Sequence, residues 1–152
     1  MKPGSTVDES TQTSSSTVDE KTTRSVLELA NIFLHCSYCF MMLSLTFKHF
    51  KMPGLKWATE QREKVCRESA RSIFEWVMES GEPILLADIL KPNNVYDEFD
   101  LTHSVIKWDR IDKWLETRLE LILEEVGGRD TNLKTTLLKI LEANRNGFQE
   151  NQ

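Results

Sequence analysis

Apolar residues recur every three or four positions through most of this chain beyond residue 25, which is the period of an amphipathic helix. The pattern is clearest over 101–126, where one stripe consists of Leu101, Val105, Trp108, Ile111, Leu115, Leu119, Ile122 and Val126. Over 55–80 an apolar face is formed by Ala58, Val65, Cys66, Ala70, Ile73, Phe74, Val77 and Met78, and the opposite face carries Glu60, Arg62, Glu63, Lys64, Arg67, Glu68 and Arg71. We therefore predict two long helices that each bury one face.

Two more helices complete the pattern. Residues 29–47 contain no Asp, Glu, Lys or Arg, so a helix over 23–47 suits either a bilayer or the centre of a bundle. Its scattered polar residues favour the bundle, and we expect no membrane association: Asn31, His35, Ser37, Ser44 and Thr46. A shorter helix, from about 130 to between 144 and 147, is expected to bury Leu133, Leu137, Leu138, Ile140 and Leu141.

Turn-forming and capping residues mark the ends of these helices. Pro53 and Gly54 interrupt the chain after the first helix, and Gly81 suits a left-handed closing position. Asp100 suits an N-cap, as does Asp130 or Thr131. The connection over 82–100 is long, contains two prolines and has five aliphatic residues within 84–90. It is typical of a crossover that joins two parallel helices of a bundle.

The two ends of the chain lie outside this pattern. Residues 1–24 are rich in Ser and Thr and repeat Ser-Thr-Val-Asp-Glu at 5–9 and at 16–20. This composition buries little apolar surface, so we predict a disordered tail, which is either a solvating extension or a phosphorylation or partner motif. Residues 148–152 form a short C-terminal tail, which leaves 25–147 as one helical domain.

Composition narrows the function classes. The 152 residues carry a net charge of -5 and no block of basic residues, so nucleic acid is not an expected partner. The three cysteines and an N-terminus without an apolar stretch predict reduced thiols in a cytoplasmic protein.

Four blocks of sequence resemble the ferritin family. Residues 34–44 read Leu-His-Cys-Ser-Tyr-Cys-Phe-Met-Met-Leu-Ser, similar to the family's Leu-x-Ala-Ser-Tyr-x-Tyr-Leu-x-x-Ser. Residues 67–70, Arg-Glu-Ser-Ala, and 130–133, Asp-Thr-Asn-Leu, are similar to its Arg-Glu-His-Ala and Asp-Pro-His-Leu. The most specific block is 81–92, Gly-Glu-Pro-Ile-Leu-Leu-Ala-Asp-Ile-Leu-Lys-Pro, which resembles Gly-Gly-x-Ile-x-Leu-x-Asp-Ile-x-Lys-Pro. Over roughly 25–147 the resemblance implies an all-α, ferritin-like four-helix bundle with a long crossover between its second and third helices, a short fourth helix and no fifth helix.

The resemblance also implies that the iron-oxidising site is missing. Its ligand positions fall on Phe33, Cys66, Ser69, Ile111 and Arg145, and its neighbouring tyrosine falls on Phe40. The family's mineral-nucleating carboxylates fall on Gln61, Lys64 and Val65, and its acidic entry pore falls on Thr135 and Leu138. We therefore expect no enzyme activity, no firm metal site and no catalytic residue, with iron as a cofactor only through the family resemblance.

The same resemblance predicts how the chain assembles. Ile84, Leu85 and Leu86 fall in the segment that forms the family's two-fold dimer contact, while the fifth helix that lines its four-fold contacts is absent. The resemblance therefore predicts a homodimer or co-assembly with full-length ferritin subunits.

The remaining candidate chemistry involves the thiols and aromatic residues. Cys36 and Cys39 form a C-x-x-C within an apolar helix, where buried thiols are a better interpretation than a redox pair. Together with Cys66 and His35 they are also weak candidates for a soft-metal site. Trp108 lies on the apolar stripe, whereas Trp57, Trp76 and Trp114 lie towards the edges of their helices. These three either pack in the core or mark a partner surface.

Two functional hypotheses follow. The first is a non-catalytic ferritin-like subunit with a structural or regulatory place in iron storage and iron homeostasis. The second is a ferritin-derived interaction or chaperone-like helical protein with no iron role.

Overall fold

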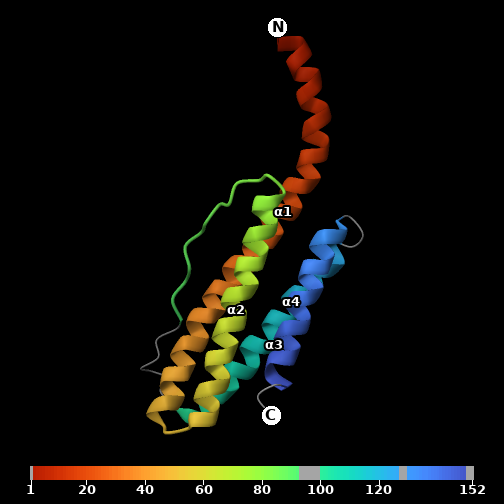
Figure 1. Ribbon diagram of the computed structural model, residues 1–152. Coiled ribbons are helices and arrows are strands. Elements are labelled where there is room, and N and C mark those ends of the chain that lie inside the picture. The colour runs from red at the N-terminus through yellow and green to blue at the C-terminus, as the bar shows by residue number, and fades with distance from the viewer. Residues whose placement is uncertain (1, 93–99, 127–129, 150–152) are drawn as a thin grey trace.

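The computed structural model describes residues 2–92, 100–126 and 130–149, and within these ranges all secondary structure is helical. Its helices are α1 (Lys2–His49), α2 (Pro53–Glu79), α3 (Leu101–Val126) and α4 (Thr131–Gln149) (Figure 1). The predicted all-α class is therefore confirmed. The predicted bounds of α3 agree with the structure, and those of α2 differ by two residues at the start and one at the end.

The helices pack as a four-membered ring. α1 contacts α2 and α3, and α4 contacts the same two helices from the other side. Neighbouring helices run in opposite directions, whereas α2 and α3 run in the same direction (Figure 1). Their apolar faces meet in one core, whose largest fully buried apolar side chains are Phe33, Phe40, Phe47, Leu29, Ile73, Leu115, Leu119, Leu133 and Leu137.

Local hydrogen bonds explain where the helices begin and end. Asp100 accepts a hydrogen bond from the backbone N–H of His103 (3.1 Å), and Asp130 accepts one from that of Leu133 (2.9 Å), so both are N-caps as predicted. α2 closes with the Glu82 N–H on the Val77 carbonyl and Gly81 at φ 83°. The end of α1 has the same pattern, but Lys51 occupies its left-handed position at φ 58°.

The largest differences from the predicted bounds are at the start of α1 and the end of α4. α1 begins at Lys2 instead of near residue 23, because no proline or glycine between residues 5 and 52 stops a helix once it is anchored. Thr22 and Thr23 are buried, and the first part of α1 projects beyond the other helices (Figure 1). α4 continues to Gln149, since Gly147 lies inside the helix and does not end it.

α1 is also the one described helix that is long and apolar enough to cross a membrane, over Glu20–His49 with a mean hydropathy of 1.5. Half of that apolar window is buried inside the bundle. Its buried hydroxyls are satisfied within the helix, since Ser37, Ser44 and Thr46 donate to carbonyls three or four residues earlier. These features are those of a core helix, although length and hydropathy alone distinguish the two cases weakly.

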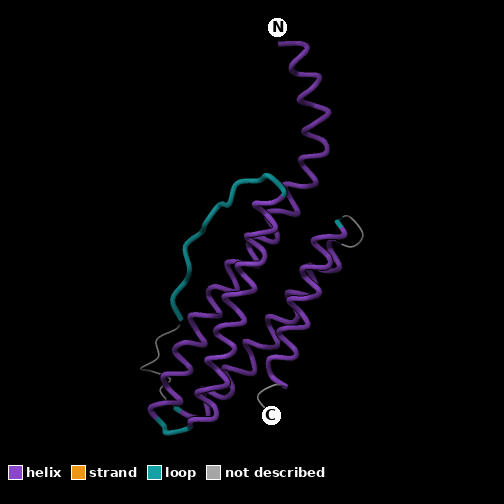
Figure 2. Tube along the Cα trace, in the orientation of Figure 1, coloured by secondary structure: helices purple, strands orange, loops and turns teal. Residues whose placement is uncertain are grey.

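The connection after α2 runs along the outside of α1. Figure 2 shows residues 81–92 as an extended segment beside the bundle. The Asn31 side-chain amide donates to the carbonyl of Asp88 (3.3 Å), and the His35 Nδ1 lies 2.6 Å from the carbonyl of Leu90. The segment is thus fixed through its backbone to one face of α1; the residues that complete the predicted crossover, 93–99, lie outside the described residues.

Candidate functional site

A buried polar cluster at the centre of the bundle receives one residue from each helix. The Arg62 side chain, from α2, donates to Asp112 Oδ1 on α3 through Nε (3.0 Å) and Nη2 (2.8 Å). Nη2 also donates to Asn144 Oδ1 on α4 (3.0 Å), and the guanidinium carbon lies 5.2 Å from the ring centroid of Phe40 on α1. The cluster therefore joins all four helices through one cation.

The burial of this cation sets the electrostatics of the cluster. Arg62 is only 1% exposed, and within the described residues its Nη1 has no hydrogen-bond partner. Burial raises the pKa of the Asp112 carboxyl above its usual range, while the neighbouring Arg62 guanidinium opposes that rise. The ion pair still holds, because the carboxylate accepts two charge-assisted hydrogen bonds at once.

The burial of Arg62 corrects the sequence prediction, which placed it on the charged face of its helix. Arg62 lies four residues after Ala58 and four before Cys66, so it shares the buried face with both. This spacing in the sequence already indicates that Arg62 is buried. Asp112 and Asn144 were not predicted either, because only the fold brings α3 and α4 to Arg62.

The positions expected for metal ligands are divided between the core and the surface. Phe33, Cys66 and Ser69 are buried, and the Ser69 hydroxyl donates to the Val65 carbonyl of its own helix (2.7 Å). Ile111 is half-buried against the core. The last position, Arg145, lies at the surface, where its Nε donates to Glu116 (2.6 Å).

The positions expected for mineral nucleation and iron entry are equally poor in carboxylates. Gln61 and Val65 are half-buried and Lys64 is exposed. On α4, Thr135 is exposed and donates to the Thr131 carbonyl. Leu138 is also exposed, which corrects its predicted place in the core; it lies one residue after the buried Leu137 and so points about 100° away from it.

The three cysteines are buried and carry their protons. Burial raises the pKa of the Cys66 thiol to about 12, and it raises the pKa values of Cys36 and Cys39 as well. All three are free thiols. The Cys39 Sγ lies 3.5 Å from the His35 Nε2, and the His35 Nδ1 donates to the Leu90 carbonyl, because a carbonyl oxygen can only accept.

The predicted soft-metal site is not assembled. Among the described residues, no group of three His, Cys, Asp or Glu side chains is placed to hold a metal ion. The set Cys36, Cys39, Cys66 and His35 lies wholly within the described chain and does not form such a group.

No family model matches this sequence, and no curated protein matches it. The function must therefore be argued from the geometry of the chain itself.

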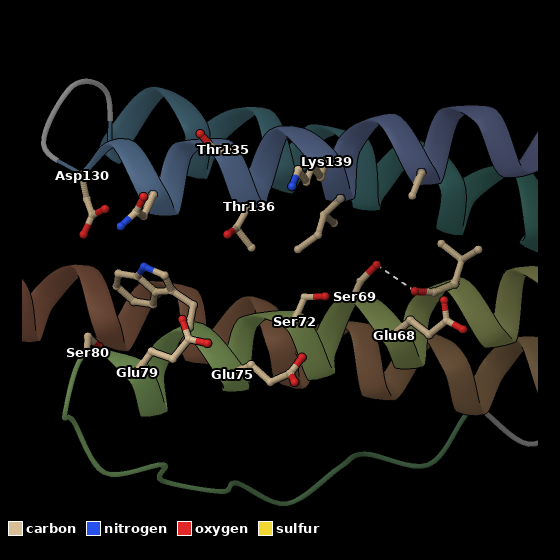
Figure 3. A pocket seen from close by; sticks show the side chains of 15 residues that line it. Glu68, Ser69, Ser72, Glu75, Glu79, Ser80, Asp130, Thr135, Thr136 and Lys139 are labelled. Atoms are coloured by element: carbon tan, nitrogen blue, oxygen red, sulfur yellow. Dashed lines mark hydrogen bonds between the residues drawn. The ribbon is translucent and has the colours of Figure 1, made fainter.

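A polar groove of about 790 Å³ lies between α2 and α4 (Figure 3). Three glutamates of α2, Glu68, Glu75 and Glu79, line one side of it. The other side is lined by Asp130 at the start of α4 and by Thr135, Thr136 and Lys139 along that helix. Negative charge thus dominates the groove, yet these carboxylates do not converge into a metal site in the part of the chain that the structure describes.

The most apolar exposed surface belongs to the connection after α2. Ile84 packs against the core, whereas Leu85 and Leu86 point outward and Leu86 is 77% exposed. Ile89 and Leu90 add to this surface, and a hollow of about 600 Å³ separates residues 82–87 from α1. Of the three residues predicted for a dimer contact, Leu85 and Leu86 are therefore exposed and Ile84 is half-buried.

Proposed function

We propose that this chain is a non-catalytic subunit of ferritin type, with a structural or regulatory place in iron storage and homeostasis. The observation that carries the proposal is the Arg62–Asp112 ion pair in the centre of the four helices. A di-iron site needs several carboxylates around two cations, and here a resident guanidinium is paired with the nearest carboxylate.

The side chains around this ion pair support the absence of iron oxidation. Cys66 keeps its proton far above neutral pH, and Phe33 offers no ligand atom. Hard ferrous and ferric ions prefer oxygen ligands, which the hydroxyl of Ser69 supplies only weakly, because it is engaged with its own helix. The chain accordingly contributes no catalytic residue and no cofactor of its own to iron chemistry.

The exposed apolar surface of the connection supports assembly. Leu85, Leu86 and Leu90 lie close in sequence on one extended segment, and solvent-exposed leucines gathered in this way favour a protein contact. The ferritin resemblance of residues 81–92 implies a two-fold contact at the same place. We therefore expect a homodimer, or co-assembly with full-length ferritin subunits, in the cytoplasm.

The test is the mass of the purified chain by light scattering, with iron content measured on the same peak. Co-expression with full-length ferritin subunits then asks whether the two chains co-purify. The double variant L85S/L86S should lower the mass or abolish co-purification. The matched control is Met78→Ser, an exposed apolar residue of α2 outside the connection.

The outcomes separate the two functional hypotheses. Iron on the assembled peak, or co-purification lost only in L85S/L86S, supports the iron-storage role. An iron-free protein that does not co-purify with ferritin subunits would overturn the iron-storage role. The alternative would remain, an interaction or chaperone-like helical protein with no iron role. Catalysed oxidation of ferrous iron would refute the non-catalytic assignment.

A further inference from the structure

α3 has a second apolar stripe on the side that faces away from the core. Ile106, Trp114 and Leu121 are all exposed, and at 3.6 residues per turn they lie within an arc of about 80°. The buried residues of α3 lie on the opposite side of the helix: Ser104, Trp108, Leu115, Leu119, Ile122 and Val126. A helix with apolar residues on two faces is suited to contact a second partner besides its own core.

Basic residues precede acidic ones beside this stripe, with Asp109 as an exception. Arg110 and Lys113, in the first half, and Glu120 and Glu124, in the second half, are all exposed. Within the chain, Lys113 pairs with Asp109 (2.8 Å), and Glu120 lies 4.0 Å from Arg145. The helix dipole favours the opposite order, with acidic residues near the start and basic residues near the end. α3 has no acidic residue in its first turn and no basic residue in its last turn. The helix dipole does not explain this order, whereas it would suit contact with a helix of reversed direction.

We propose that a second copy of this chain docks on this face, with the two α3 helices antiparallel about a two-fold axis near Trp114. Ile106 and Leu121 lie equally far from residues 113–114, so antiparallel pairing sets Ile106 of one copy opposite Leu121 of the other. The two Trp114 rings meet at the axis. Arg110 of one copy then lies within one helical turn of Glu120 of the other, and the surface is complementary to itself, as a two-fold contact requires.

This contact goes beyond the assembly proposed above and does not depend on it. Its residues lie on α3, whereas the leucines of that assembly lie in the connection after α2. The stripe from Ile106 to Leu121 extends over about 22 Å. One helix pair of that length buries less than the roughly 800 Å² per partner of a standard interface, so the dimer should be weak and concentration-dependent.

Sedimentation equilibrium of the full chain, from about 1 μM to about 300 μM, measures this association. The background variant Leu86→Glu removes association through the connection, and it should still form dimers with a measurable dissociation constant. Adding Ile106→Glu should raise that constant about tenfold or more. Val105→Glu is the matched control, because Val105 and Ile106 are neighbours with exposed fractions of 44% and 43%, and Val105 points about 100° away from the stripe.

A charge exchange tests the antiparallel orientation. Arg110→Glu and Glu120→Arg should each weaken the dimer, and the double variant should restore it. Within one helix the two residues are about 15 Å apart, so the restoration must come from the second copy. Three results would each overturn the proposal. The L86E protein could be monomeric at every concentration, I106E and V105E could have equal effects, or the double charge variant could dimerise no better than either single one. If the wild-type chain forms dimers and L86E does not, the chain associates through the connection after α2 and not through α3.

Discussion

Two nitrogens of Arg62 converge on one oxygen of Asp112, Nε at 3.0 Å and Nη2 at 2.8 Å. The bond joins α2 to α3 across the inside of the bundle, and Nη2 continues it to Asn144 on α4. The arginine is fully buried and the aspartate partly so. A cation that is held on several sides in this way fixes the relative positions of the helices more specifically than apolar packing alone.

The stability of the bundle should depend on keeping this pair intact. Asp112→Ala leaves the Arg62 charge buried without its partner, and we expect it to lower the free energy of unfolding by about 3 kcal/mol. The double variant R62L/D112L should recover most of that loss. Urea denaturation measures both. Lys56→Ala, which breaks an exposed pair with Glu60 at 3.0 Å, is the control and should cost less than about 0.5 kcal/mol.

The buried thiols should make the protein less stable in alkali. In the unfolded chain the pKa of the Cys66 thiol is near its ordinary value of 9.0, and in the folded chain burial raises it to about 12. Between these values the unfolded chain loses a proton that the folded one keeps, so stability is full below pH 9 and falls as the pH rises towards 12, by up to about 1.4 kcal/mol per pH unit for one thiol. Denaturation at pH 8, 9 and 10 should show a smaller slope for Cys66→Ala than for wild type. Equal slopes in the two proteins would contradict this assignment.

The two left-handed helix ends should respond in opposite ways to glycine. Gly81→Ala places a side chain at φ 83° and should cost about 1 kcal/mol, whereas Lys51→Gly relieves φ 58° and should stabilise by up to about 1 kcal/mol. Gly54→Ala is the control, since it lies in the first turn of α2 with nothing within 4 Å of the added methyl, and it should be neutral or stabilising. Thermal melting of the three variants gives the order.

His35 should protect the connection after α2 from proteolysis. Its Nδ1 is bonded to the Leu90 carbonyl at 2.6 Å, so His35→Ala frees that backbone while the rest of the bundle stays packed. Thermolysin cleavage within 82–92 should accelerate several-fold, with little change in the melting temperature. His103→Ala, on the exposed side of α3, should cleave at the wild-type rate.

Removal of residues 2–19 should leave the bundle intact, because this part of α1 projects beyond the other helices (Figure 1). We expect a melting temperature within about 2 °C of the full chain. Residues 2–19 belong to helix α1, so their removal should lower the far-UV ellipticity per molecule. Unchanged ellipticity per molecule after truncation would contradict a helix that begins at Lys2.

The sequence predicted the helices well and the inside of the bundle less well. The N-caps Asp100 and Asp130 and the closing Gly81 are local signals, and all three were found. The spacing of apolar residues predicted burial less accurately than the capping residues predicted the helix ends. Val105 was assigned to the apolar stripe of α3 and is exposed, while Ser104 is buried in its place. The central cluster depends on contacts between Arg62 and residues 50 and 82 positions later, which no local pattern encodes.

The way α1 holds the connection has a consequence for how this surface evolves. Asn31 and His35 bind carbonyl oxygens at residues 88 and 90, which every amino acid possesses. The attachment is therefore indifferent to the side chains of the segment that it fastens. The outward residues, including Leu86 and Leu90, can therefore be substituted during evolution without loss of the attachment. The binding properties of this surface can change in this way while the bundle underneath remains unchanged.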